Sequence, residues 1–351
     1  MVTLAREKSE LRELIDRHLG HLLEREMGRL DFLGDEERAA VRRYVADFVL
    51  RGGKRLRPSF VYWGYRAAGG SPADLDVVLP AACAVELLHA CALLLDDVMD
   101  EAGTRRGQTT AHAGLAARHR ELGWSGDPRR FGESTAVLLG MMAFTWADAA
   151  LLDSGRRLGE ALEIFTRLRV EIIAGQYMDL AGAARGTGGR EEATLIARYK
   201  SGKYTVERPL HLGCAIAGGG PAVRPTLSAY ALPLGEAFQL RDDVLGVFGD
   251  PAATGKPAAI DLLQGKRTYL TAVARERAGA RGAAVLDHVR DQDDVAAARD
   301  LIVSTGALDT VEARIAGLLV AARAAIDGAD LPAEAAAALL ELADAATARN
   351  A

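Results

Sequence analysis

Residues 80–100 read PAACAVELLHACALLLDDVMD, an apolar segment that ends in three aspartates. Apolar side chains recur within it at steps of three and four residues, at Val85, Leu88, Ala92 and Leu95. That spacing matches the 3.6-residue repeat of an α-helix and predicts one continuous apolar face. Alanine and leucine dominate the chain and aromatic residues make up only 5% of it, which also favours helices. We therefore expect a long buried helix that carries its aspartates at the carboxyl end.

The same helical periodicity returns along the chain, and signals for strands are nearly absent. It recurs in 136–152, 162–180, 194–217 and 234–248, and clusters of Gly and Pro separate these segments at 69–72, 123–132, 182–189, 218–221 and 249–257. Neither a sustained apolar–polar alternation nor an Asn-Gly turn indicates a sheet. The sequence predicts an all-α protein with one domain spanning 1–351. We expect a bundle of ten or more helices, with a motif-bearing core at about 51–270 and further packed helices at about 271–351.

Composition and charge exclude several classes of protein. Of the 351 residues, 49% are apolar and 26% are charged, which allows a sizeable core and argues against disorder. The net charge of −5, without basic clusters interleaved with aromatics, argues against nucleic-acid binding. Three cysteines in apolar segments predict reduced core thiols in a cytoplasmic protein, at Cys83, Cys91 and Cys214. Residues 1–10 do not resemble a signal peptide, and charged residues interrupt the longest apolar runs, so we expect no transmembrane segment.

Three carboxylates close the helix predicted at 80–100. Asp96 and Asp100 lie one helical turn apart on the same face, and Asp97 lies beside them. Like charges at this spacing repel one another, and the helix dipole also disfavours anions at a carboxyl end. A solvated helix end would be the usual interpretation of such a cluster in isolation. Because a buried helix leads into this one, its carboxylates need a partner, and Mg²⁺ prefers carboxylate and phosphate oxygens as ligands.

A second acidic cluster has the same setting. The segment FQLRDD at 238–243 follows an apolar helical stretch and precedes a glycine-containing loop. The pair Asp242 and Asp243 would be weak support for a metal site if it stood alone. Two such clusters, far apart in sequence, are stronger support, because two facing carboxylate sets can hold Mg²⁺ ions with a diphosphate between them.

Basic residues accompany both acidic clusters. The segment GGKRLRP at 52–58 places cations beside two glycines, and TRRG at 104–107 follows the first cluster. Further lysines occur at Lys203, Lys256 and Lys266. Each of these is more often a solvated surface charge when taken alone, but together they supply the charges that a metal-bound diphosphate needs. His89 lies two helical turns before Asp96 on nearly the same face, which favours anion binding over a core role.

Taken together, these motifs resemble those of the trans-isoprenyl diphosphate synthases, the polyprenyl synthetase family, and most of all its bacterial geranylgeranyl diphosphate synthases. The matching motifs run from about Arg51 to Lys266 in the family's order and are GGKRLRP (52–58), His89 with DDVMD (96–100), RRG (105–107), GQYMDL (175–180), KYT (203–205), FQLRDD (238–243) and GK (265–266). The resemblance implies an isoprenoid synthase fold, with the helices around a central cavity. It also implies a homodimeric prenyltransferase that joins isopentenyl diphosphate to an allylic diphosphate (dimethylallyl, geranyl or farnesyl), with three Mg²⁺ ions bound together with diphosphate.

By this resemblance each motif residue takes a role. Mg²⁺ would be bound by Asp96, Asp97, Asp100, Asp242 and Asp243. Isopentenyl diphosphate would be held by Lys54, Arg57, His89 and Arg106. The allylic diphosphate would be held by Arg105, Lys203, Gln239, Lys256 and Lys266. The region where the carbocation forms would be lined by Gln176 and Thr205.

Two departures from the family's pattern leave alternatives open. Gly246 stands where many relatives have a third aspartate, and either Asp250 or a water would compensate for the missing carboxylate. Lys200 competes with Lys203 for the position of the family's lysine, because the spacing does not decide between them.

Small residues before the first acidic cluster bear on the product. By the resemblance, Cys91 and Ala92, with Leu88 one turn deeper, would floor the pocket that receives the growing tail. No aromatic residue blocks it there, so we expect geranylgeranyl diphosphate, with farnesyl or longer polyprenyl diphosphates as alternatives. A class I terpene cyclase shares the acidic motif and the helical fold, but the Asn/Ser/Glu metal motif that normally accompanies them is missing from the sequence. A non-catalytic helical subunit would be expected to lose one acidic cluster, and this chain retains the acidic pair in both.

Overall fold

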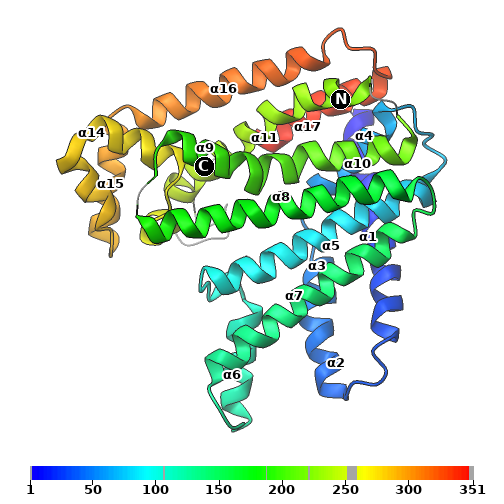
Figure 1. Cartoon of the computed structure of the whole chain (residues 1–351), viewed down its shortest axis with the longest axis horizontal. Helices are drawn as coiled ribbons and strands as arrows, with labels where there is room; N and C mark the ends of the chain where they lie inside the picture. The colour runs from blue at the N-terminus through cyan, green and yellow to red at the C-terminus, as the bar shows by residue number, and fades with distance from the viewer. Residues whose placement is uncertain (1, 106, 187, 220–221, 251–258, 348–351) are drawn as a thin grey trace. The chain divides into compact units, whose positions relative to one another are not determined.

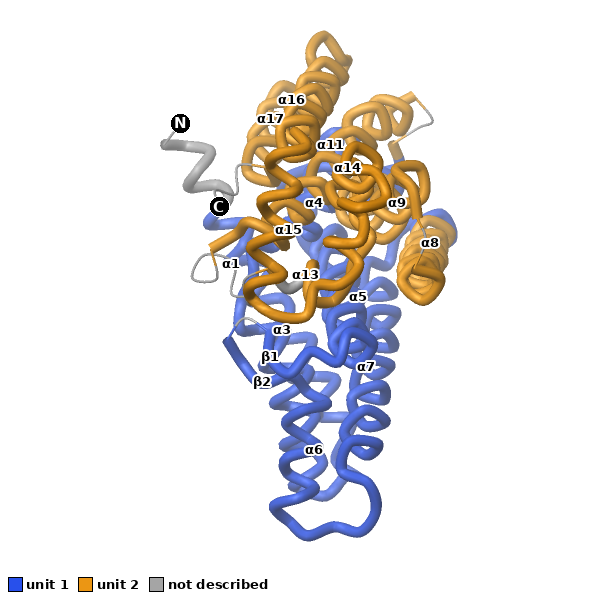
Figure 2. Tube along the Cα trace, turned by 90° about the vertical axis from the view of Figure 1, so that its left-hand side faces the viewer, with its two compact units in different colours: residues 1–162, 212–218 blue, residues 163–211, 219–351 orange. Residues whose placement is uncertain are grey.

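The computed structural model of the chain describes residues 2–105, 107–186, 188–219, 222–250 and 259–347, without the side chains of 2–8 and 260 (Figure 1). Regular structure within these ranges is helical apart from two strands of two residues each, which confirms the predicted all-α class. The chain divides into two compact units, Met1–Leu162 with Leu212–Gly218, and Glu163–His211 with Gly219–Ala351 (Figure 2). That the whole chain is one domain stays a prediction.

The first unit is built on the helix predicted from residues 80–100. In order, its elements are α1 (Val2–Gly28), α2 (Asp35–Val41), the π-helical turn η1 (Arg42–Ala46), α3 (Asp47–Leu50), α4 (Leu56–Ala67), α5 (Leu75–Met99), β1 (Thr104–Arg105), β2 (Gln108–Thr109), α6 (Ala111–Glu121) and α7 (Pro128–Leu152). From Val78 to Cys91 the side chains of α5 are buried almost without interruption. The helix α7 runs beside α5 (Figure 1), and Gly140 permits this approach, because a Cβ there would lie 3.1 Å from Leu95 Cδ2.

Two breaks predicted from Gly and Pro lie inside helices. The helix α7 begins at Pro128, within the segment 123–132. Proline suits the first position of a helix because its missing N–H would have no partner there, and the Asp127 side chain accepts a hydrogen bond from the Arg129 backbone N–H at 2.9 Å. The helix α8 (Leu158–Arg185) likewise continues through Gly182. Pro128 therefore marks the start of a helix. At Gly182, the helix stability lost to glycine is smaller than the stability that its neighbours on α8 contribute.

The second unit is organised around one long helix, α11. The helices α8 and α10 contribute residues to both units. The elements after α8 are α9 (Arg190–Ile196), the π-helix η2 (Ala197–Glu207), α10 (Arg208–Ala217), α11 (Val223–Phe248), α13 (Ile260–Leu263), α14 (Tyr269–Asp287), α15 (Gln292–Ser304), α16 (Ala307–Ile326) and α17 (Ala333–Thr347). The helix α11 packs against η2 and α16. Gly235 of α11 meets Gly202 of η2 so closely that a Cβ at 235 would lie 2.5 Å from the Gly202 Cα. The further helices predicted after residue 271 are present as α14 to α17.

Two of these helices, α5 and α7, are long and apolar enough to cross a membrane by length and composition alone. In α5, 72% of the apolar window is buried inside the protein, as expected for a core helix. In α7 the buried share is 44%, and Leu138, Met141 and Leu152 expose 65%, 56% and 61% of their surface. The helix α7 thus presents an apolar face that the described part of the chain leaves open. The absence of a transmembrane segment stays a prediction.

Candidate active site

The first acidic motif occupies the last turn of α5. Asp96 and Asp97 lie on the helix and Asp100 caps its carboxyl end. Arg105, on strand β1, reaches back to two of these carboxylates: its Nε donates to Asp97 Oδ1 at 2.6 Å and its Nη2 donates to Asp96 Oδ2 at 3.1 Å. The short hairpin of β1 and β2 therefore carries a cation directly to the acidic motif. Arg106 lies outside the described residues.

Asp97 is buried, with 2% of its surface exposed. Burial raises the pKa of Asp97 to about 6, although Arg105 opposes the shift, and the neighbouring Asp96 and Asp100 raise it further. One arginine therefore does not offset the desolvation of a carboxylate that stands beside two others. An added cation would relieve this repulsion, and the oxygen donors at this helix end are of the kind that Mg²⁺ prefers.

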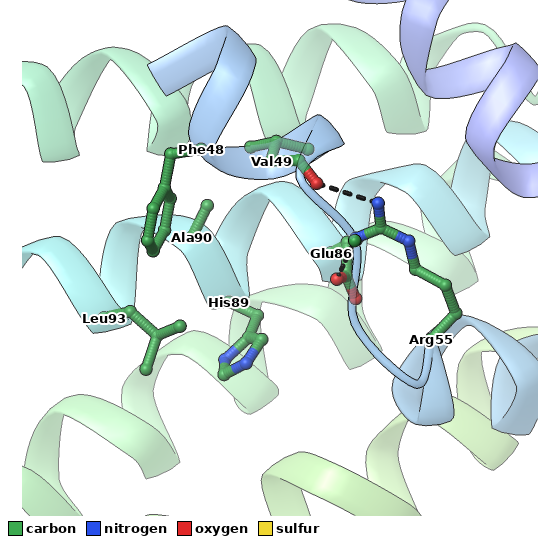
Figure 3. Close-up of a pocket in the computed structure, with 8 residues that line it drawn as sticks. Phe48, Val49, Arg55, Glu86, His89, Ala90 and Leu93 are labelled. Atoms are coloured by element: carbon green, nitrogen blue, oxygen red, sulfur yellow. Dashed lines mark hydrogen bonds and ion pairs between the residues drawn. The ribbon is translucent and has the colours of Figure 1, made fainter. Parts of the chain in front are cut away.

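The loop between α3 and α4 holds the GGKRLRP motif and divides its basic residues between two roles. Lys54 is exposed, and Arg57 is half-buried in the first turn of α4. Arg55 points into the protein (Figure 3), where its Nη1 donates to Glu86 Oε1 at 2.5 Å. Its Nε donates to Asp16 Oδ1 at 2.7 Å, and its Nη2 to the Val49 carbonyl oxygen at 2.8 Å. Arg55 thus joins α1, α3 and α5. That Lys54 and Arg57 hold a ligand stays a prediction.

The structural role of Arg55 was not predicted from the sequence. Glu86 was the available signal, since a carboxylate inside an apolar helix needs a buried cation. Burial by itself lowers the pKa of Arg55, but the carboxylates of Glu86 and Asp16 outweigh it and hold that pKa above its usual value. His89 lies one turn after Glu86 and lines the same pocket as Arg55 and Gly52 (Figure 3). The structure therefore brings His89 to the loop that carries the predicted isopentenyl-binding cations.

The second acidic motif lies in the last two turns of α11, which ends at Phe248. Asp243 is 5% exposed and accepts a hydrogen bond from Gln239 Nε2 at 2.7 Å. Burial raises the pKa of Asp243 to about 7, Asp261 and Asp242 raise it further, and the hydrogen bond from Gln239 opposes the shift. Like Asp97, this carboxylate is desolvated beside other negative charges. The predicted residues Gln239, Asp242 and Asp243 are therefore brought together at one helix end.

Arg241, between these residues in sequence, serves α16 instead. Its Nη1 and Nη2 donate to Glu312 Oε1 and Oε2 at 2.6 and 2.7 Å. The cation nearest in sequence to the second motif therefore anchors α11 to α16.

The remaining part of the second motif involves α13. Lys266 lies 3.7 Å from Asp261, measured from Nζ to Oδ1. Gly246, on the last turns of α11, has the Asp261 carboxylate directly beside its Cα, so that a Cβ at this position would lie 1.8 Å from Asp261 Oδ2. Asp250 is exposed beyond the end of α11, and Lys256 lies outside the described residues.

The two candidate lysines of η2 have different partners. Lys200 Nζ donates to Asp179 Oδ2 at 2.5 Å, and Asp179 lies three residues after Gln176 on α8. Gly175 allows this pairing, because a Cβ there would lie 2.5 Å from the Lys200 backbone nitrogen. Lys203 Nζ instead donates to Glu207 Oε2 at 2.8 Å within the same helix.

The partners of Lys203 belong to a buried ionic network. Glu171 lies 4.0 Å from Lys203 Nζ and accepts two hydrogen bonds from Arg208, at 2.7 and 2.6 Å. Thr205, predicted to line the reaction region, is fully buried in η2. The charge of Lys203 is therefore opposed by carboxylates inside the protein, while Lys200 and Gln176 lie near each other where α8 meets η2.

The predicted chain-length residues lie on the buried part of α5. Leu88 and Cys91 are buried, Ala92 is half-buried, and burial raises the pKa of the Cys91 thiol to about 11. A Cβ on Gly140 of α7 would lie 3.7 Å from the Cys91 carbonyl oxygen, so α7 packs beside this part of α5. That these side chains floor a tail pocket stays a prediction.

The two acidic motifs belong to different units, Asp96–Asp100 to the first and Asp242–Asp243 to the second. That they share one cavity stays a prediction. Across the described ranges, no group of three or more His, Cys, Asp or Glu side chains is arranged to hold a metal ion by itself. Such open carboxylate sets fit Mg²⁺, which keeps several waters and takes oxygens from a bound diphosphate along with one or two carboxylates.

Comparison with known proteins identifies the family of the chain. The polyprenyl synthetase family profile matches residues 38–303. The geranylfarnesyl diphosphate synthase of Aeropyrum pernix is 31% identical over 276 residues, which are 76% of this chain and 80% of that one. The (2E,6E)-farnesyl diphosphate synthase of Mycobacterium tuberculosis is 33% identical over 263 residues, or 72% of this chain and 68% of that one. A geranylgeranyl pyrophosphate synthase from Corynebacterium glutamicum, crystallised with isoprenyl diphosphate and magnesium, is 38% identical with a TM-score of 0.92, covering 97% of this chain and 99% of its own.

Proposed function

This chain belongs to the polyprenyl synthetase family, and we propose that it is a Mg²⁺-dependent synthase that condenses isopentenyl diphosphate with allylic diphosphates to give geranylgeranyl diphosphate. The observation that carries the proposal is shared by Asp97 and Asp243. Each is almost fully buried in the last turns of a long helix, beside further aspartates, and accepts a side-chain hydrogen bond. Desolvated carboxylates in such sets need a cation. A diphosphate substrate carries bound Mg²⁺, which is such a cation.

The residues of the chain bind and orient two substrates. Lys54, Arg57 and His89 are suited to the diphosphate of the isopentenyl substrate, and Arg105, Gln239 and Lys266 to that of the allylic one. When bound, Mg²⁺ supplies positive charge against the departing diphosphate. The allylic carbon–oxygen bond breaks to give an allylic cation and diphosphate, the isopentenyl alkene attacks the cation, and a proton is lost to the diphosphate. No side-chain nucleophile is required, because the protein positions the reactants and stabilises charge.

Of the two candidate lysines, Lys200 is better placed for the allylic diphosphate. Its partner Asp179 is about as exposed as Lys200 itself, 27% against 24%, and lies on the helix that carries Gln176. Lys203 is 14% exposed and has carboxylates of Glu171 and Glu207 around it. To reach a ligand, Lys203 would have to give up its hydrogen bond to the buried Glu207, whereas Lys200 would give up a bond to a more exposed carboxylate.

The two lysines should therefore respond differently to truncation. Lys200→Ala should lower kcat/KM for the allylic substrate about 100-fold while the free energy of unfolding stays near that of the wild type. Lys203→Ala should cost about 1–3 kcal/mol of stability, because it removes the hydrogen bond that Lys203 donates to the buried carboxylate of Glu207. Steady-state kinetics measure kcat/KM for the allylic substrate, and urea unfolding measures the free energy of unfolding of both variants. If Lys203→Ala loses allylic affinity at unchanged stability, the assignment is reversed.

The product and the reaction class are tested together. The purified chain is incubated with Mg²⁺, isopentenyl diphosphate and each allylic starter, and products are identified by chromatography. We expect geranylgeranyl diphosphate, and Cys91→Phe should shorten the product by filling the space before the first acidic motif. Farnesyl diphosphate as the sole wild-type product would overturn the predicted length. Hydrocarbon formed from an allylic diphosphate without isopentenyl diphosphate would favour a terpene cyclase instead.

The open face of α7 supports a homodimer. Its exposed apolar residues, Leu138, Met141 and Leu152, share one side of the helix with Thr145. An interface between two copies would cover this stripe symmetrically. In sedimentation velocity the wild type should be a dimer, and Leu138→Glu with Met141→Glu should give monomers. A monomeric wild type, or one that pellets with lipid vesicles through α7, would contradict the proposal.

A further inference from the structure

The space beside Gly246 is taken by another carboxylate. A Cβ built on Gly246 would lie 1.8 Å from Asp261 Oδ2, 2.5 Å from its Cγ and 3.3 Å from its Cβ. The carboxylate of Asp261 therefore occupies the position from which a side chain at 246 would start. Gly246 is four residues after Asp242, so this position lies on the same face of α11, one turn further on.

The segment that carries Asp261 is anchored to α11. On either side of Asp261, Ala259 and Leu262 are buried in the core cluster that also contains Leu240 and Val244 of α11. The short helix α13 is thus held by apolar contacts, and Asp261 is directed at the last turns of α11. Asp250, by contrast, is exposed and follows Gly249, whose extended backbone ends the helix.

The local charges also require an explanation. The Asp261 side chain is only 13% exposed. Its ion pair with Lys266, 3.7 Å long, is made by Oδ1, while Oδ2 lies at Gly246. Three carboxylates gathered at the last turns of one helix repel one another, and a bound cation relieves that repulsion.

We propose that Asp261 is the third carboxylate of the second acidic motif, that it takes the place left by the missing side chain at Gly246, and that with Asp242 and Asp243 it binds the metal–diphosphate complex. This inference rests on the proposed function. It explains why position 246 is glycine here: any Cβ would displace the carboxylate that does the same work from α13. It also makes Asp250 unnecessary to the motif.

Binding of inorganic pyrophosphate to the full-length chain, measured by calorimetry with and without Mg²⁺, tests the inference. With Mg²⁺, Asp261→Asn should weaken pyrophosphate binding about 10- to 100-fold. Without Mg²⁺, the same variant should bind pyrophosphate at least as well as the wild type, because it has lost a negative charge. A merely structural role for Asp261 would weaken both. Asp250→Asn should bind as the wild type does.

Moving the carboxylate provides a second test. Gly246→Asp alone should weaken Mg²⁺-dependent binding by crowding Asp261, whereas Gly246→Asp combined with Asp261→Ala should bind more tightly than Asp261→Ala alone. The inference fails if Asp261→Asn binds as the wild type does while Asp250→Asn does not, or if the double variant folds and recovers nothing. Should the double variant not fold, the comparison of Asp261→Asn with Asp250→Asn decides. A wild type that does not bind Mg²⁺ and pyrophosphate would instead overturn the proposed function itself.

Discussion

Replacing Asp97 or Asp243 with asparagine should lower kcat/KM for condensation at least about 100-fold, the effect expected when one preorganised charge is removed from a site where negative charge departs. Asparagine keeps the size of aspartate and one of its acceptor oxygens. The hydrogen bond from Arg105 to Asp97, or from Gln239 to Asp243, can therefore persist. The substitution removes the buried negative charge. The decrease in kcat/KM therefore measures how much this charge contributes to binding the metal-bound diphosphate.

The same substitutions should have the opposite effect on stability. Burial raises the pKa of Asp243 to about 7 and that of Asp97 to about 6, so at pH 8 each carboxyl is ionised at the expense of the folded state. In protein stripped of metal with a chelator, Asp243→Asn should therefore raise the thermal unfolding midpoint. A site that is repulsive until its ligand binds is a common cost of function.

The control is an aspartate away from both motifs. Asp31, exposed in the turn after α1, should tolerate Asn with neither effect. Steady-state incorporation of labelled isopentenyl diphosphate and calorimetric melting are the two measurements. Activity of Asp97→Asn and Asp243→Asn within about threefold of the wild type would remove both residues from the proposed site.

The all-α fold could be predicted from the sequence because the buried face of a helix appears as a short-range repeat of apolar residues. The apolar face of α5 repeats within every few residues, so its burial and its acidic end could be predicted from residues 80–100 alone. The same is true of α11 and Asp243. Pro128 misled the prediction because proline marks the start of a helix as readily as a break, and only the cap at Asp127 distinguishes the two.

Pairings between segments could not be predicted in the same way. Nothing local in KRLR indicates which cation faces inward, since this depends on the backbone of Arg55 and on the distant Glu86. The choice between Lys200 and Lys203 depends on Gly175 bringing α8 against η2. Asp261 lies fifteen positions after Gly246 in sequence and becomes its neighbour only when α13 docks on α11.

Arg55→Met should destabilise the protein by about 3–5 kcal/mol, because it leaves Glu86 charged and buried without a cation. The Arg55 side chain is 1% exposed and that of Glu86 11%, so water cannot replace the lost ion pair. Methionine keeps much of the apolar volume of arginine. Position 55 has a left-handed backbone, φ +46°, that strains arginine and methionine alike. Neither packing nor backbone strain therefore accounts for the expected loss of stability.

The neighbouring Lys54→Met is the matched control for Arg55→Met. Lys54 is exposed in the same loop, so its loss should change stability by no more than about 0.5 kcal/mol while raising KM for isopentenyl diphosphate. Urea unfolding separates the two variants. Adding Glu86→Leu to Arg55→Met should recover part of the lost stability, since an apolar pair has no charge left to desolvate. Equal stability of Arg55→Met and Lys54→Met would show that both cations of this loop face solvent, and the division of the motif into an anchoring arginine and two ligand-binding cations would be wrong.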